Sequence, residues 1–147
     1  MKRVATIGFG RKGAERLVEL LSSAGVTIVI DIRRRPDGPL SGYARQRDLP
    51  YILRLVGIEY AHRPQLAPPS ELLDRYREDK DWYAYVPVFE ETVLASAEAR
   101  DAMKDVLALP GVPALLCVEP TPEKCHRRLV AERMNEELGP IEITHLV

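Results

Sequence analysis

Residues 114–128, ALLCVEPTPEKCHRR, combine an apolar segment, a polar turn and the start of a helix. The five residues from Ala114 to Val118 are apolar or small, which is typical of a short buried strand. Thr121 offers a hydroxyl that can cap a helix, and Pro122 fits the first helical position. The stretch therefore predicts a strand, a tight turn and a helix that begins near Thr121.

A strand followed closely by a helix brings polar side chains to one edge of a sheet. Free backbone N–H groups and the helix dipole favour an anion at such an edge. Taken singly, these side chains have ordinary structural interpretations, such as small buried hydrophobes, a core imidazole and an ion pair between Arg127 and Glu123. Their convergence indicates a candidate functional site instead. The side chains expected there are Cys117, Glu119, Cys125, His126 and Arg127.

The length and composition are those of one ordinary globular domain. The chain has 147 residues, of which 46% are hydrophobic and 29% charged, so a real core is possible but not two domains. No apolar run approaches the roughly 18 residues of a membrane span, and the opening MKRVATIGFG contains no secretory h-region. We therefore expect a cytoplasmic protein with no membrane partner. Two cysteines separated by seven residues leave free thiols, a metal site or a redox pair as options.

Charge is divided unevenly along the chain. Residues 1–65 carry 12 Lys and Arg against 6 Asp and Glu, whereas residues 66–147 carry 9 against 16. Arginines interleaved with tyrosines between Arg33 and Arg63 resemble a surface that binds phosphates or stacks on bases. The overall pI of about 6.3 argues against a dedicated nucleic-acid binder, so we favour a solvated basic loop that faces the acidic half.

The alternation of apolar segments along the chain predicts the fold class. We expect a single compact α/β domain over residues 1–147, with a mostly parallel sheet of about five strands and helices on both faces, Rossmann- or flavodoxin-like. Strands are expected at residues 4–7, 26–32, 58–61, 114–118 and 141–147. Helices are expected at residues 14–24 and 49–56, from Ser70, within 89–109 with a possible break near Ser96, and from Thr121. The carboxyl edge of the sheet would then also collect Gly8, Gly10, Asp31 and Arg33.

The segment Gly8 to Gly13, GFGRKG, matches the G-x-G-x-x-G pattern of dinucleotide-binding folds, and Asp31 follows 18 residues after Gly13. However, the chain has no room for a separate substrate domain, and Arg11 and Lys12 would crowd a pyrophosphate. We therefore interpret the glycines as a turn that lets the first strand meet its helix.

Three kinds of chemistry fit the polar edge. Cys117, Cys125 and His126 could ligate a metal, with Glu119 or Asp31 as a fourth ligand, although the spacing is not a strong zinc signature. A cysteine in the first turn of a helix suits a stabilised thiolate, which favours Cys125 over Cys117 as a nucleophile.

A carboxylate pair is the third possibility. Asp31 and Glu119 follow two strands that could be neighbours, and together they could perform acid–base work. Their structural alternatives are salt bridges to Arg33 and Arg127.

Several motifs resemble one known family. TIGFGR from Thr6, DIRRRP from Asp31, GIEY from Gly57, LLCVEPTPEKCHR from Leu115 and LVAERM from Leu129 resemble the bacterial and archaeal domain-of-unknown-function family 488. The similarity extends from about Thr6 to His145, and the C-x-E-x5-C-H-R element is its most specific motif. The chain departs from the family pattern at residues 66–69 and in a slightly long loop at residues 36–41. The resemblance implies a compact α/β fold and motif positions at Asp31, Arg33, Pro36, Ser41, Tyr60, Cys117, Glu119, Cys125, His126 and Arg127.

The family name supplies no reaction, so the functional hypothesis depends on the residues. We expect an enzyme acting on a phosphate-bearing, nucleotide or nucleic-acid-related substrate at the carboxyl edge. The alternatives are a non-catalytic anion- or nucleic-acid-binding module and a Cys/His metal-binding protein. The sequence indicates no particular cofactor or oligomeric state. The candidate catalytic residues are Cys125, His126, Glu119 and Asp31, and the candidate ligand-binding residues are Gly8, Arg33, Ser41, Tyr60 and Arg127.

Overall fold

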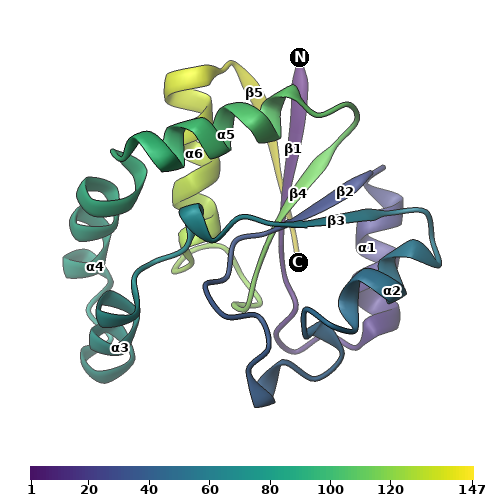
Figure 1. Cartoon of the computed structure of the whole chain (residues 1–147), viewed down its shortest axis with the longest axis horizontal. Helices are drawn as coiled ribbons and strands as arrows, with labels where there is room; N and C mark the ends of the chain where they lie inside the picture. Colours follow the sequence, from purple (N-terminus) through teal and green to yellow (C-terminus); the bar gives the residue numbers. More distant parts are fainter.

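The computed structural model describes residues 1–147 (Figure 1). Its five strands are β1 (Lys2–Gly8), β2 (Ile28–Asp31), β3 (Glu59–His62), β4 (Pro113–Cys117) and β5 (Ile141–Leu146). Its α-helices are α1 (Ala14–Ser23), α2 (Leu49–Arg54), α3 (Ser70–Asp79), α4 (Trp82–Phe89), α5 (Ala97–Ala108) and α6 (His126–Leu138). Shorter helical segments are η1 (Pro39–Ala44), η2 (Pro64–Leu66) and a π-helical turn, η3 (Glu90–Leu94).

The strands form one sheet in the order β3-β2-β4-β1-β5, and every neighbouring pair is parallel. Chain connections from β1 through β3 move toward one edge of the sheet, whereas those from β3 through β5 move back across it. Because such crossovers are right-handed, the two sets of helices must cover opposite faces. Figure 1 shows this arrangement, with α1 and α2 on one side of the sheet and α3 to α6 on the other. The predicted α/β fold with helices on both faces is confirmed.

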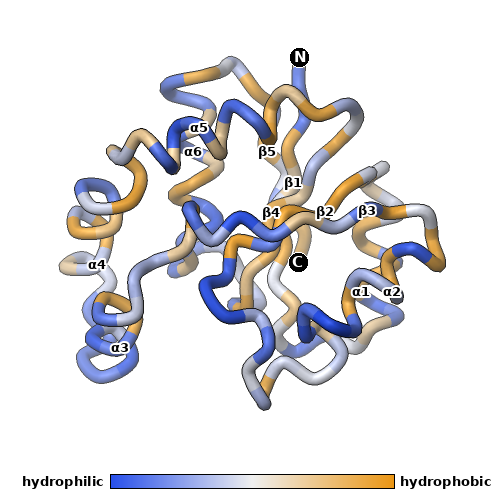
Figure 2. Tube along the Cα trace, in the orientation of Figure 1, coloured by the Kyte–Doolittle hydropathy of each residue, from blue (hydrophilic) through white to orange (hydrophobic).

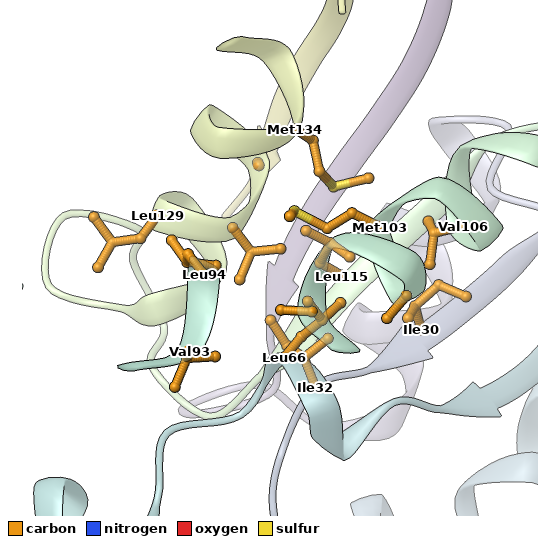
Figure 3. Packing of buried hydrophobic residues seen from close by; sticks show 14 of the residues in the cluster. Ile30, Ile32, Leu66, Val93, Leu94, Met103, Val106, Leu115, Leu129 and Met134 are labelled. Atoms are coloured by element: carbon orange, nitrogen blue, oxygen red, sulfur yellow. The ribbon is translucent and has the colours of Figure 1, made fainter. Parts of the chain in front are cut away.

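Each face of the sheet has its own apolar core. On the α3–α6 face, Ile30, Ile32 and Leu115 meet Met103 and Met134 from the helices (Figure 3). The opposite core packs α1 and α2 against alternate strand residues, and its members include Ile7, Leu17, Leu21, Val29, Leu49, Leu53 and Leu116. Burying each such side chain contributes about 1.5–3 kcal/mol. The inner strands β2 and β4 are consequently buried on both sides, whereas the edge strand β3 is partly exposed and appears largely pale or blue in Figure 2.

Two parts of the predicted helix pattern were incorrect. α6 begins at His126, with Cys125 as its N-cap residue, rather than near Thr121. Glu119 and Thr121 each precede a proline, which disfavours helical backbone, so residues 118–125 form a loop.

The second error is α4, which the sequence did not predict. It is capped by Asp81, whose Oδ1 accepts a hydrogen bond from the backbone N–H of Ala84 at 3.1 Å. The break expected near Ser96 is confirmed, because Ser96 caps α5. None of the helices combines the length and the apolar character that crossing a bilayer requires.

Candidate functional site

The structure divides the predicted polar edge between the two faces of the sheet. Asp31 is in register with Leu116, which belongs to the core beneath α1 and α2. Successive strand residues point to opposite faces, so Cys117 points to the face that α6 covers. The predicted residues therefore form two groups at the same edge, one around Cys117 and one around Asp31, rather than a single site.

The first group places two thiols and an imidazole in contact. The Sγ atoms of Cys117 and Cys125 are 2.7 Å apart, and Nδ1 of His126 lies 3.6 Å from the Cys117 sulfur. Nε2 of His126 lies 2.8 Å from the carbonyl oxygen of Ile32. Because a carbonyl only accepts hydrogen bonds, Nε2 carries a proton, and Nδ1 is the ring nitrogen that faces the thiols.

Arg127 supplies a positive charge behind the thiols. Its side chain is 0% exposed, and Nη1 donates to the carbonyl oxygen of Glu119 at 2.6 Å. Nε donates to the hydroxyl of Thr6 at 3.3 Å, while Nη2 has no hydrogen-bond partner. The ion pair with Glu123, which was the structural alternative for Arg127, is not formed, and no salt bridge joins the buried guanidinium to a carboxylate.

Two further basic side chains lie near Arg127. Lys12 donates from Nζ to the carbonyl oxygen of Pro120 at 3.3 Å, and burial together with Arg127 lowers its pKa. Nδ1 of His145 is 2.7 Å from the Thr6 hydroxyl, and burial and Arg127 also lower the pKa of this imidazole. This end of β1 is therefore a place where positive charge is crowded and an anion would be stabilised.

The pKa values of the two thiols move in opposite directions. Burial raises the pKa of Cys117, but the Cys125 thiol, the backbone N–H groups of Glu119 and Val118 and the charge of Arg127 outweigh it, so the net shift is downward. Burial and the contact with Cys117 raise the pKa of Cys125 well above its ordinary range. These directions favour Cys117 as the thiolate and Cys125 as its hydrogen-bond donor, the reverse of the preference drawn from the sequence.

The second group is a closed ion-pair network. Arg33 binds Asp31 through Nε at 2.9 Å and Nη2 at 2.7 Å, and the Tyr60 hydroxyl donates to Asp31 Oδ2 at 2.6 Å. Arg33 also stacks over Phe9 at 4.9 Å and reaches the Ser41 hydroxyl at 3.5 Å. The members of this group bind one another, and they join β2 to β3 and to the loop around Ser41.

The glycine-rich segment packs against the chain itself. A Cβ atom on Gly8 would overlap the carbonyl oxygen of Glu119, and one on Gly10 would overlap the carbonyl oxygen of Val118. The backbone N–H of Gly10 is already bonded to Val118 O at 2.8 Å. The loop at residues 118–120 thus occupies the space that a pyrophosphate would need, and Gly8 does not face a free ligand position.

Neither carboxylate joins the thiol group. Glu119 has an exposed side chain and contributes only its backbone to the site, and Asp31 is committed to Arg33 on the other face, so the expected carboxylate pair does not form. A metal ion could be offered three donors, because the ligand atoms of Cys117, Cys125 and His126 lie within 4.8 Å of one another.

The sequence analysis missed three polar residues near Arg127, namely Thr6, Lys12 and His145. Thr6 and His145 are paired in register between β1 and β5. The Thr6 hydroxyl within the apolar run of β1 and the imidazole near the end of β5 were the available signal, but their contact depends on a strand order that the sequence does not specify.

Together these features define a parallel α/β protein with a buried thiol pair and an uncompensated arginine at the carboxyl edge of its sheet. A family model described as Domain of unknown function DUF488 matches residues 13–134, so the chain belongs to that family. The matched segment includes residues 117–127. No curated protein and no solved structure matches the chain.

Proposed function

We propose that the chain is an enzyme that uses the Cys117 thiolate as a nucleophile on a small substrate bearing a carboxylate or phosphate. The observation that carries this proposal is the burial of Arg127 without a carboxylate partner and with Nη2 unpaired. An uncompensated buried charge costs several kcal/mol, and unpaired buried donors are rare in proteins. A thiolate at Cys117 and an anionic substrate would together supply the missing negative charge.

Each member of the thiol group has a distinct part in this proposal. Cys117 attacks the substrate, Cys125 donates a hydrogen bond to the thiolate, and the lone pair of His126 Nδ1 accepts a proton during the reaction. Arg127 stabilises the thiolate and holds the anionic group of the substrate. Cys117 is only 4% exposed, so this proposal requires the loop at residues 118–125 to move aside for the substrate.

The contacts of the basic loop favour a small anion over a nucleic acid. Arg33 is paired with Asp31, and Arg34 donates to the carbonyl oxygens of Pro68 at 2.8 Å and Ala67 at 3.2 Å. The hydroxyl of Tyr43 is likewise bonded to the backbone of the chain. Much of the arginine and tyrosine set is therefore engaged within the protein, which weakens the nucleotide and nucleic-acid alternative.

Alkylation with two reagents of different charge tests the proposal. Iodoacetate is an anion and iodoacetamide is neutral, so a site that binds anions raises the ratio of their rates. We expect Cys125→Ser to be labelled at Cys117, Cys117→Ser to be nearly unreactive, and Arg127→Met to lower the iodoacetate to iodoacetamide ratio. Arg128→Met is the matched control, because Arg128 carries the same charge on the same helix and pairs with Glu132 at 2.9 Å. Failure of both reagents to label Cys117 in folded, metal-free protein would overturn the proposal.

Two alternative functions have distinct signatures in the same experiment. A non-catalytic anion-binding module would bind phosphate or carboxylate compounds through Arg127 while both thiols remain inert. A metal-binding protein, favoured by the three donors within 4.8 Å, would contain stoichiometric metal, and its thiols would react only after a chelator is added.

A further inference from the structure

The separation of the two sulfur atoms lies nearer to that of a disulfide bond than to that of two zinc ligands. Two cysteine ligands of a tetrahedral zinc ion, each about 2.3 Å from the metal, lie roughly 3.8 Å apart. The sulfurs of Cys117 and Cys125 are 2.7 Å apart, too close to receive a metal between them without moving away from each other. Formation of a disulfide requires the opposite movement, a small approach through side-chain rotation.

We infer that Cys117 and Cys125 are a catalytic dithiol that reduces an anionic low-molecular-weight disulfide, an inference that rests on the proposed function of the Cys117 thiolate. The positions of the two residues suit an attacking and a resolving cysteine. Cys117 ends β4, and Cys125 is the N-cap residue of α6, with its sulfur 2.7 Å from that of Cys117. A disulfide between them would join the strand to the helix across the loop at residues 118–124.

The reaction proceeds by two exchange steps that conserve atoms and electrons. The Cys117 thiolate attacks one sulfur of the substrate RS–SR, forms a Cys117–SR mixed disulfide and releases RS⁻. The Cys125 thiol then loses its proton to His126 Nδ1 and attacks the Cys117 sulfur, forming the Cys117–Cys125 disulfide and releasing the second RS⁻. The substrate gains two electrons, and the protein dithiol loses two. A dithiol reductant returns the protein to its starting state by the reverse exchange.

The charges around Cys117 determine which class of substrate disulfide the protein attracts. Arg127 is buried behind Cys117, and Lys12 lies against the loop that covers it. No carboxylate forms a salt bridge with either cation, so a disulfide whose substituents carry carboxylates is attracted and one with ammonium groups is repelled. Oxidised glutathione, whose carboxylates outnumber its ammonium groups, and cystamine, which carries only ammonium groups, are suitable probes of these two classes.

Trapping of the mixed disulfide tests the inference. Cys125→Ser keeps a hydroxyl donor beside the Cys117 sulfur but cannot resolve the intermediate. We expect this variant to accumulate one glutathionyl group on Cys117, whereas the wild-type protein releases two equivalents of glutathione and acquires an internal Cys117–Cys125 disulfide. Mass spectrometry of the intact protein and its peptides distinguishes these products. Oxidised glutathione should react on the order of tenfold faster than cystamine, and Arg127→Met should reduce this preference.

Several results would contradict the inference, and they are separable from failure of the proposed function. A glutathionyl group on Cys125 in preference to Cys117, or equal rates with both probes, would overturn the assignment. If Cys125→Ser is alkylated by iodoacetate at Cys117 but forms no mixed disulfide, disulfide reduction is excluded while the thiolate proposal stands. If neither iodoacetate nor oxidised glutathione modifies Cys117 in folded protein, both proposals fail. Circular dichroism of each variant establishes that it is folded.

Discussion

Arg127 is bound to the turn that follows Cys117, since its Nη1 atom donates to the carbonyl oxygen of Glu119 at 2.6 Å. The neighbouring Cys125 thiol and the charge of the guanidinium both lower the pKa of Cys117. Arg127→Met retains much of the side-chain volume but removes the charge. We therefore expect the pKa of Cys117 to rise, so that the alkylation rate at pH 7 falls and its pH profile moves to higher pH.

Arg128→Met is the control for this experiment. Arg128 is partly exposed and pairs with Glu132, so its removal should leave the pH profile of Cys117 unchanged. An equal shift in both variants would show that general electrostatics, and not the buried guanidinium, determines the reactivity of the thiol.

Gly8 is predicted to tolerate no side chain, because the loop that covers the thiols lies directly on it. A Cβ atom there would also come within 2.8 Å of Arg127 Nη1. Overpacking of this kind costs about 1–3 kcal/mol, so we expect Gly8→Ala to lower the free energy of unfolding by that amount. Gly13→Ala is the matched control, since no atom lies within 4 Å of the added Cβ. Urea denaturation measures the free energy of unfolding of both variants. An equal loss of stability in the two would refute the proposed role of Gly8.

Much of the fold follows from local sequence signals. The apolar runs around Val29 and Leu115 predicted buried parallel strands, and the glycine and proline breaks delimited most helices. The helix α4 could not be predicted in this way, because it is apolar on all sides and contains Pro87. Tyr76 of α3 packs against Trp82 at 5.7 Å and against Tyr85 at 5.3 Å, and these tertiary contacts stabilise α4.

The candidate site was only partly predictable for a different reason. The sequence correctly placed Asp31 and Cys117 at the carboxyl ends of strands. The face of the sheet toward which each side chain points depends on the register between β2 and β4, in which Asp31 is opposite Leu116. A shift of one residue would have put both on the same face, and a single sequence does not specify that register.

Tyr60 gives a pH-dependent prediction for the second group. Burial, followed by the hydrogen bond to Asp31, raises the pKa of Tyr60 above its ordinary value near 10. A raised pKa in the folded state means that the contribution of Tyr60 to stability is present below pH 10 and is lost as the pH rises beyond it. Tyr60→Phe should lower the free energy of unfolding by about 1.5–3 kcal/mol at pH 7, which is the value of a hydrogen bond to a charged group. The difference in stability between this variant and the wild-type protein should become smaller above pH 10. Tyr83→Phe is the control, because Tyr83 is 86% exposed. This substitution should change neither the free energy of unfolding at pH 7 nor its dependence on pH.

The last prediction tests whether the two polar groups are independent. Asp31→Asn leaves the guanidinium of Arg33, which is 6% exposed, without its counter-ion, and breaking such a pair costs about 3–5 kcal/mol. Because Asp31 and Cys117 point to opposite faces of the sheet, we expect the folded variant to be alkylated at Cys117 at the wild-type rate. Chemical denaturation measures the free energy of unfolding, and the alkylation rate is measured under conditions in which the variant is fully folded. Asp48→Asn, which removes an exposed carboxylate, is the control. If Asp31→Asn proves too unstable, Tyr60→Phe perturbs the same network more gently. Slower alkylation of Cys117 in either folded variant would mean that the two groups act as one site across the sheet edge, and Asp31 would return to the catalytic hypothesis.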